Sequence, residues 1–405
     1  MAERPASSAR ILSLDVMRGV AMMLMALDHV RDYYAPTLFA VEDLSRTTPA
    51  LFLTRWITHI GAPIFVLLVG TGAFLYRSRH RLGNSELARF LVTRGLWLIV
   101  LEFTIMHFVW WLCPDPGWLA SPYGVLYGQI LWTLGLSMIV LAGLVYLPTA
   151  AVGALGAITI VGHHLLERWT FELGVLATDP SEFTIAQKVW AVLHVPTRFP
   201  WLGDHVFGVV YPLIPWVGVV ALGFGLGPLF LLGPERRRRM LLWLGLGSCA
   251  AFLILRATNL YGDPYPWTVQ EDMVFTLFSF GNVEKYPVSL SFLLMTLGPI
   301  FLLLAWFDRA EGPVARFLAV FGSVPLFFYV VHLALINATA GLYFWLRWGQ
   351  PRWGAMMYAA YPLGYVYNLP VVYAVAVGVV LVMYPLCLWF ARVKKTHDAW
   401  WLSYL

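Results

Sequence analysis

The chain has 405 residues, of which 60% are apolar and only 12% are charged, and its mean hydropathy is +0.72. Soluble domains contain roughly 45–50% apolar and about 25% charged residues, so this composition excludes an ordinary soluble fold. The formal net charge is +5, but the basic residues lie in short segments between apolar runs, which argues against a nucleic-acid-binding protein.

The apolar runs predict the secondary structure. A bilayer-spanning helix needs about 20 apolar residues, and hydrocarbon leaves the backbone of such a run no hydrogen-bond partner outside its own helix. The first run carries Asp15, Arg18 and Asp28, unlike the apolar region of a cleavable signal peptide, so we expect it to be retained as a helix. We therefore predict an all-α, polytopic membrane helix bundle of about ten spans, nine to eleven, that forms a single domain over residues 1–405. The predicted spans are 12–34, 57–76, 90–112, 125–146, 149–166, 206–231, 240–257, 288–307, 316–340 and 370–391.

The connections between these runs predict the orientation of the chain. Basic residues gather in the second, sixth and eighth connections and in the tail, which all fall on one side of a ten-span bundle. By the positive-inside rule that side is the cytoplasm, so both termini are expected inside. The other connections are longer, and the last of them is predicted to lie at the membrane interface or to hold a short extra span. These predicted exoplasmic connections are 35–56, 113–124, 167–205, 258–287 and 341–369.

Ionisable residues inside spans are costly and suggest function. Seven of the ten histidines fall in one predicted exoplasmic layer, although a single histidine at a helix end is more often an interfacial hydrogen-bonding group. Histidine with a neighbouring carboxylate is the usual general acid–base pair, so the layer predicts an active site. The layer contains His29, His59, His107, His163, His164, His205 and His332, with Asp28, Asp32, Glu102, Asn259 and Lys285 in or near it.

A second group of candidates lies at the predicted cytoplasmic face. Asp15 and Arg18 are spaced i, i+3 and can form a simple salt bridge that anchors the first helix. The arginines of the second connection can be explained by topology alone, but guanidinium groups also match the phosphates of a cytosolic donor such as coenzyme A. The candidate phosphate-binding residues are Arg18, Arg77, Arg79, Arg81 and Arg94.

Several blocks of the sequence resemble a known family. The blocks are SLDVMRGVAMMLMALDHVRDYY at 13–34, RWITHIGAPIFVLLVGTGAFL at 55–75, RGLWLIVLEFTIM at 94–106, YPLIPWVGVVALGFGLG at 211–227, EKYPVSL at 284–290 and VPLFFYVVH at 324–332. Over nearly the whole chain they resemble the DUF1624 family of bacterial membrane proteins, which is grouped with the heparan-α-glucosaminide N-acetyltransferase catalytic domain.

The resemblance implies a membrane-bound acyltransferase that moves acetyl from cytosolic acetyl-CoA to an amino sugar or a sugar hydroxyl on the exoplasmic side. It implies a multi-pass protein of the bacterial cytoplasmic (inner) membrane, in contact with lipid and with a glycan acceptor, and without a metal. The family's catalytic histidine lies in the loop after the first matching helix. In this chain loop 35–56 has no histidine, so the candidate bases are His29, oriented by Asp28 or Asp32, and His59.

The remaining roles and readings stay open at this point. Asn259, Lys285 and His332 are the candidates for binding the acceptor or stabilising the oxyanion of the reaction. One competing interpretation is a proton-coupled transporter, because intramembrane His and Asp residues also form proton relays. Another is a haem or metal oxidoreductase, because histidines from facing helices can ligate iron. The sequence leaves a homodimer open.

Overall fold

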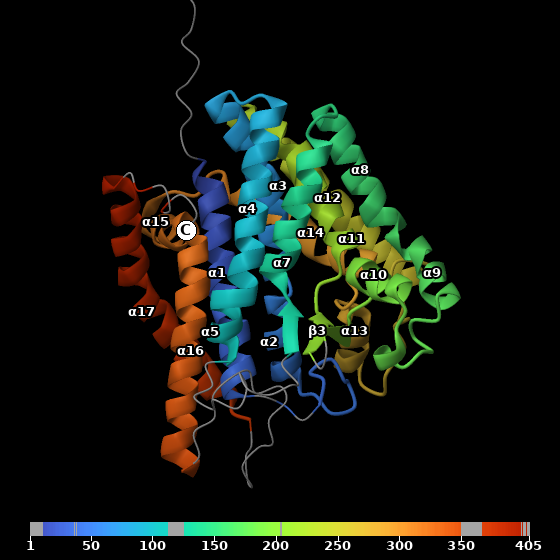
Figure 1. Ribbon diagram of the computed structural model, residues 1–405. Helices are drawn as coiled ribbons and strands as arrows, with labels where there is room; N and C mark the ends of the chain where they lie inside the picture. Colours follow the sequence, from blue (N-terminus) through green and yellow to red (C-terminus); the bar gives the residue numbers. More distant parts are fainter. Residues whose placement is uncertain are drawn as a thin grey trace, which may run out of the picture.

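A computed structural model describes residues 11–111 except 36 and 38, residues 125–202, 205–349 and 367–397, and the single residues 399 and 402. It is dominated by long helices that run side by side, as Figure 1 shows. The all-α, polytopic fold class predicted from composition is confirmed. The predicted interfacial segment 341–369 falls largely outside the described residues, although helix α16 continues as far as Trp348.

Eight helical stretches in the described part of the chain are long and apolar enough to cross a membrane. Helix α7 is apolar but shorter, and α1 carries charged residues toward both of its ends. The long helices are α1 (Leu12–Tyr34), α2 (Pro49–Thr58) followed by α3 (Gly61–His80), α4 (Asn84–Leu101), α7 (Ile130–Leu144), α8 (Thr149–Gly162), α11 (Leu213–Leu226), α12 (Pro234–Thr258), α14 (Leu290–Phe307), α15 (Gly312–Ser323), α16 (Pro325–Trp348) and α17 (Leu369–Thr396).

Short elements complete the described chain. The π-helix η1 (Glu102–Met106) and α5 (His107–Trp111) extend α4, and the remaining short elements either continue α8 and α11 or lie in the connections between helices. They are η2 (His163–Leu166), α9 (Glu167–Glu172), η3 (Pro180–Glu182), α10 (Ile185–His194), η4 (Gly227–Leu231) and α13 (Met273–Gly281).

The predicted span 316–340 is wrong in detail, because the chain breaks at Val324 into two helices. A residue before proline is disfavoured in the helical conformation, and Val324, which precedes Pro325, has φ −138° and ψ 55°. Helix α15 packs against α1, whereas α16 is the long apolar helix. The break matters for the site because α16 carries His332.

A second proline accounts for the bend between α2 and α3. Pro63 has no amide hydrogen to donate to the carbonyl four residues earlier, which is that of His59. The predicted span 57–76 also begins too late, because the helical stretch already starts at Pro49. Thr48 caps this start by accepting a hydrogen bond from the amide of Leu51. His59 sits at the bend itself.

A small three-stranded sheet was not predicted. Strand β3 (His205–Val209) pairs in parallel with β1 (Val125–Gly128) and antiparallel with β2 (Thr197–Leu202). The predicted spans 125–146 and 206–231 thus each begin with a strand before the helix starts. These strands lie at the end of the bundle that also carries α2 and α13 (Figure 1).

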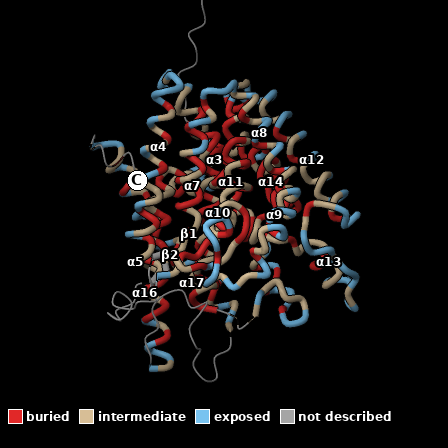
Figure 2. Tube along the Cα trace, turned by 45° about the vertical axis from the view of Figure 1, so that its right-hand side comes forward, coloured by how far each residue is buried: buried red, intermediate tan, exposed pale blue. Residues whose placement is uncertain are grey.

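Helices α1, α3, α11 and α14 contribute much of the buried core, and the buried residues of α3, α11 and α14 run through the middle of Figure 2. In the stretch Pro49–His80, which contains α3, and in α14, 67% of an apolar 18-residue segment is buried, against 17% for α12 at the outside. Glycines let these helices approach closely, as is common in membrane bundles. A Cβ on Gly70 of α3 would lie 1.9 Å from the carbonyl oxygen of Val220 in α11.

The basic connections share one end of the bundle. Asp308 at the end of α14 accepts hydrogen bonds from Ser13 of α1 and Arg237 of α12. Arg77 at the end of α3 donates to Thr149 at the start of α8. These contacts join the ends of helices that Figure 1 shows at the top of the molecule, opposite the small sheet. That this end faces the cytoplasm remains a prediction.

Candidate active site

A cavity of about 860 Å³ lies at the opposite end of the bundle, between α1, the α2–α3 bend, the small sheet and the segment 282–286. Of the predicted site residues, it brings together Asp28, His29, Asp32, His59 and Lys285. They come from three segments that are far apart in the sequence. Other side chains of the cavity wall include Glu42, Arg55, Thr58, Trp110, Tyr127, Gln129, Tyr211, Tyr286 and Tyr329.

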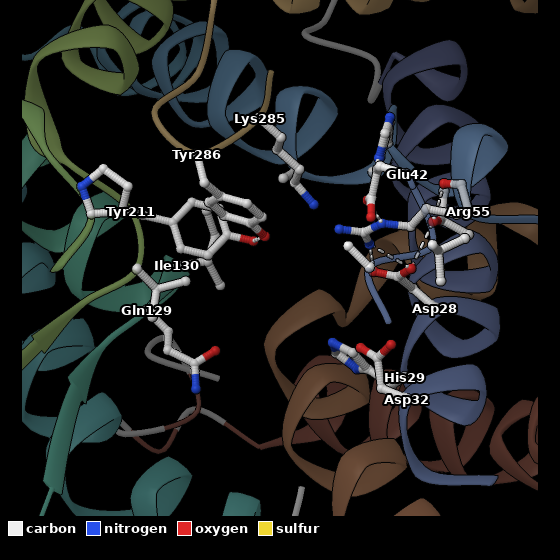
Figure 3. A pocket seen from close by; sticks show the side chains of 18 of the residues that line it. Asp28, His29, Asp32, Glu42, Arg55, Gln129, Ile130, Tyr211, Lys285 and Tyr286 are labelled. Carbon is white, nitrogen blue, oxygen red and sulfur yellow. Dashed lines mark hydrogen bonds and ion pairs between the residues drawn. The ribbon is translucent and has the colours of Figure 1, made fainter. Parts of the chain in front are cut away.

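An ion-pair network holds one wall of the cavity (Figure 3). The carboxylate of Asp28 lies 2.8 Å from a guanidinium nitrogen of Arg31 and 3.1 Å from one of Arg55. The hydroxyl of Thr58 donates to the same carboxylate at 2.6 Å. Arg31 also pairs with Asp32 at 2.6 Å. Asp28 thereby fixes helix α1 against the end of α2 and neutralises two guanidinium groups that would otherwise be costly to bury.

Glu42 extends this network into the loop after α1. Its carboxylate accepts from Nε of Arg55 at 2.9 Å, and its backbone carbonyl accepts from Asn282 at 2.9 Å. Burial alone would raise the pKa of the Glu42 carboxyl, but the guanidinium of Arg55 outweighs it, so the pKa lies below its ordinary value. Glu42 therefore ties the loop to both neighbouring walls as a carboxylate.

His29 contacts a second histidine. Its Nδ1 lies 2.9 Å from Nε2 of His332, and the two rings stack with 5.1 Å between their centres. His332 is fully buried in α16, and its own Nδ1 lies 2.7 Å from the carbonyl oxygen of Phe328, one turn earlier. Of these two histidines only His29 lines the cavity, and His332 lies behind it.

His59 lies on the same side of the cavity but is arranged differently. Its side chain is buried at the bend between α2 and α3, and neither ring nitrogen has a hydrogen-bond partner among the described residues. The nearest carboxylate oxygen, on Glu42, is 4.0 Å from Nε2. No described group therefore fixes which nitrogen of His59 carries the proton.

Lys285, Tyr286 and Tyr211 form the facing wall, and in Figure 3 their polar ends point across the cavity toward Arg55 and Asp28. The Lys285 ammonium lies 5.1 Å from the centre of the Tyr286 ring, and the hydroxyls of Tyr286 and Tyr211 are 3.3 Å apart. Burial alone would raise the pKa of the Tyr286 hydroxyl, but the positive charges of Lys285 and Arg55 lower it below the ordinary tyrosine value. Burial, with Tyr286 beside it, raises the pKa of Tyr211.

The segment that carries Lys285 and Tyr286 is held from behind. Asp263 accepts hydrogen bonds from the amide of Glu284 at 3.0 Å and from the hydroxyl of Ser289 at 2.8 Å. Arg256 of α12 donates to the backbone carbonyls of Ser279, Phe280 and Asn282. This side-chain-to-backbone network fixes a loop that has little regular secondary structure of its own.

Asn259 and the predicted phosphate-binding residues do not line the cavity. Asn259 caps the end of α12 and exchanges hydrogen bonds with the backbone of Trp267. Arg18 pairs with Asp15 at 2.9 Å near the start of α1, which is the predicted anchoring salt bridge. Arg77 lies over the rings of Phe74 and Phe224 at the far end of the bundle. Arg79 and Arg81 lie at the same end, where α3 finishes, whereas Arg94 lies ten residues into α4, because that helix already begins at Asn84.

The other histidines of the predicted layer lie away from the cavity. His163 and His164 form a second cluster with His194, which the sequence analysis did not include. His163 bonds the carbonyl of Val288, and the amide of Leu290 donates to His164. This cluster fastens α8 to the segment that follows Tyr286. His107 begins α5 and His205 is exposed on β3.

Sequence reasoning missed Arg55, Glu42, Tyr211 and Tyr286 as parts of the site. Arg55 did carry a signal, because it is a cation four residues before His59 on the predicted exoplasmic side, where basic residues are few. The tyrosines carried none, since aromatic residues are common throughout this chain and at membrane interfaces generally. They belong to the cavity wall only because the fold places the loop 282–286 opposite α1.

The fold and the cavity together define a class: a multi-pass membrane protein with a charged, histidine-containing cavity at one end of its helix bundle. A family profile described as heparan-alpha-glucosaminide N-acetyltransferase, catalytic, matches residues 10–257, which is more than half of the chain. The chain therefore belongs to this family, and the predicted resemblance to the heparan-α-glucosaminide N-acetyltransferase catalytic domain is confirmed over residues 10–257, whereas the resemblance to DUF1624 stays a prediction. This places it among membrane acetyltransferases. No curated protein sequence matches the chain.

Proposed function

We propose that this protein transfers acetyl from acetyl-CoA, taken up from the cytoplasm, to an amino group or a hydroxyl of a sugar on the opposite side of the membrane. The observation that carries the proposal is the cavity in which the imidazole of His29 faces Lys285 and Tyr286 (Figure 3). It contains a candidate base on one wall and candidate oxyanion donors on the other. The whole chain would act as one catalytic domain in a bacterial inner membrane.

The donor phosphates would bind at the end of the bundle that carries Arg18, Arg77, Arg79 and Arg81, with Arg94 deeper along α4. Exposed Arg79 and Arg81 at the end of α3 are available to phosphate, and Arg81 ends the helix in a left-handed conformation. Arg18 and His29 are eleven residues apart on α1, which corresponds to about 16 Å along a helix. The thioester arm of the donor would therefore run along α1 toward the cavity.

The chemistry would begin with proton removal from the acceptor. His29, or else His59, takes the proton of the attacking nitrogen or oxygen, which forms a bond to the acetyl carbon. The carbon–sulfur bond of the thioester then breaks. The imidazolium gives its proton to the leaving sulfur, so coenzyme A departs as the thiol. Lys285 and the Tyr286 hydroxyl would stabilise the negative oxygen between these two steps. Asn259 is assigned no part, because its side chain holds Trp267.

The cavity wall also suits a sugar acceptor. Carboxylates and guanidinium groups beside tyrosine and tryptophan rings can hydrogen-bond hydroxyls and pack against the apolar faces of a sugar ring. An amino sugar in its charged form would in addition be attracted by Asp28 and Asp32.

Turnover of labelled acetyl-CoA by purified protein tests the proposal, with amino sugars and neutral sugars as acceptors. His29→Ala is expected to lower transfer by about 10²-fold or more while donor binding, measured by calorimetry, stays intact. Combined replacement of Arg79 and Arg81 by Ala should instead weaken donor binding, most strongly at low ionic strength. His205→Ala, on the exposed face of β3, is the matched control and should change neither.

An absence of acetyl-CoA binding by the wild type would contradict the proposal. If purified protein instead moved a solute across proteoliposomes in exchange for protons, the transporter interpretation would replace it.

A further inference from the structure

The hydrogen bonds of His332 determine which nitrogen of His29 can act as a base. The Nδ1 of His332 lies 2.7 Å from the carbonyl oxygen of Phe328, and a carbonyl oxygen can only accept. That nitrogen must therefore carry a hydrogen. In a neutral imidazole the other nitrogen, Nε2, then carries a lone pair.

His332 is expected to be neutral from its surroundings. It is fully buried, and the rings around it belong to His29, Phe328 and Tyr329, none of which carries a negative charge. A buried imidazolium without a nearby anion is costly. The lone pair on Nε2 of His332 therefore faces Nδ1 of His29 across 2.9 Å.

The contact with His332 also determines which nitrogen of His29 carries its hydrogen. Its Nδ1 must supply the hydrogen for the 2.9 Å contact, because the facing nitrogen of His332 can only accept. The hydrogen-free nitrogen of neutral His29 is then Nε2. No hydrogen bond to that nitrogen is present in the described part of the chain, and His29 lines the cavity.

We propose that His332 is a positioning residue which, with the Phe328 carbonyl behind it, holds His29 in the tautomer whose Nε2 lone pair is available to the acceptor. The inference rests on the proposed function and deepens it, because it selects His29 over His59 as the base. His59 has no corresponding partner on either ring nitrogen.

The arrangement also accommodates the proton that catalysis delivers. When Nε2 of His29 takes the proton of the acceptor, the ring becomes positive, and its Nδ1–H bond to the His332 lone pair becomes charge-assisted and stronger. The proton stays on His29 until the leaving thiolate takes it back. The chain of Phe328 carbonyl, His332 and His29 thus corresponds to the orienting half of a nucleophile–base–orienter triad, with a neutral imidazole where a carboxylate is more usual.

Two substitutions of His332 separate positioning from packing. His332→Leu keeps the bulk of the side chain but removes the hydrogen-bond acceptor, so His29 adopts the wrong tautomer in a fraction of the protein. We expect kcat to fall by about 10²-fold or more, with little change in KM for acetyl-CoA. His332→Gln places an amide oxygen near the Nε2 position and should retain kcat within about tenfold of the wild type. Full activity of His332→Leu, or equal losses in both variants, would overturn the proposal.

A spectroscopic measurement makes the test independent of activity. In ¹⁵N-histidine-labelled wild type, with His29→Ala used to assign the signal, His29 should show a hydrogen on Nδ1 and none on Nε2 at neutral pH. A signal from the opposite tautomer or from imidazolium would overturn the proposal even in an active enzyme. If the expected tautomer is found in a protein that does not transfer acetyl, the proposed function fails while the positioning stands.

Discussion

At the scale of single residues, Asp28 carries the most connections in the cavity wall. It pairs with Arg31 and Arg55 and accepts from Thr58, whereas the one ion pair of its neighbour Asp32 among the described residues is with Arg31. The side chain of Asp28 is 18% exposed, so the loss of its charge would leave Arg31 with Asp32 and Arg55 with Glu42 in a largely buried wall.

We therefore expect Asp28→Asn to lower the free energy of unfolding by about 3 kcal/mol, because it removes the one carboxylate that two buried guanidinium groups share, although each keeps a second carboxylate. Asp32→Asn is the matched control and should cost about 1 kcal/mol or less. Thermal unfolding of both variants in the same detergent measures the difference. Equal losses would show that the network does not depend on Asp28.

Tyr286 gives the rate an alkaline limit if its neutral hydroxyl donates to the oxyanion. Because Lys285 and Arg55 lower the pKa of this hydroxyl, deprotonation should begin at a lower pH than for an ordinary tyrosine, whose pKa is about 10. The rate should fall as the pH rises through that pKa, since the phenolate can no longer donate.

In Tyr286→Phe the fall of the rate at high pH should disappear. The rate at neutral pH should drop about tenfold, which is less than the loss expected when an enzyme loses its one oxyanion donor, because Lys285 remains. Tyr211→Phe keeps the Tyr286 hydroxyl and should keep an alkaline limb. A pH profile of kcat for the three proteins is the measurement. An unchanged alkaline limb in Tyr286→Phe would remove this residue from the mechanism.

The residues of the site were only partly predictable from sequence. Of the predicted residues, five line the cavity, and they drew attention because an ionisable side chain in or beside an apolar segment is conspicuous: Asp28, His29, Asp32, His59 and Lys285. The partnership of His29 with His332 could not be found, because it joins residues 303 positions apart and depends on the break at Val324 that sets where α16 begins.

At the scale of elements, the central helices depend on close backbone contact. A Cβ on Gly70 would lie 1.9 Å from the Val220 carbonyl oxygen, and one on Gly223 would lie 2.1 Å from that of Leu67. Since α3 also carries the bend at His59 near its start, separation of α3 from α11 would disturb the cavity as well as the core.

Gly70→Ala should therefore destabilise the protein by about 1–3 kcal/mol, the usual cost of forcing extra volume into a packed interior. Gly143→Ala in α7 is the matched control, because a Cβ there meets nothing within 4 Å, and alanine favours a helix. Chemical or thermal unfolding of the two variants compares them. A Gly70 variant as stable as the Gly143 variant would mean that the two helices can separate at little cost.

The lengths of the apolar runs predicted most of the long helices, and the errors in their boundaries have local causes. Proline residues interrupt the helix inside two predicted spans, at Val324 and at His59. Hydropathy does not detect such interruptions, because proline does not make a segment less apolar. The strands β1 and β3 were absorbed into predicted spans because short apolar β-segments and the ends of apolar helices look alike in composition. The sheet they form brings Tyr127 and Gln129 to the cavity.

At the scale of the whole molecule, the arginine-rich end and the cavity lie at opposite ends of the helix bundle (Figure 1). If the first end faces the cytoplasm, donor and acceptor meet the protein from different compartments. The account therefore requires group transfer across the membrane, which is a stronger claim than acetyltransferase activity in detergent.

Sided proteoliposomes test this claim directly. The orientation of the protein is determined by labelling Ser85→Cys at the arginine-rich end and Trp201→Cys on the sheet with an impermeant reagent. Labelled acetyl-CoA is then supplied on one face of the membrane and the sugar acceptor on the other. The account predicts acetylated sugar only when acetyl-CoA is on the face of Ser85 and the acceptor on the face of Trp201, with no product in His29→Ala. Product formed only when both substrates share one face, or only when acetyl-CoA is on the face of Trp201, would contradict it.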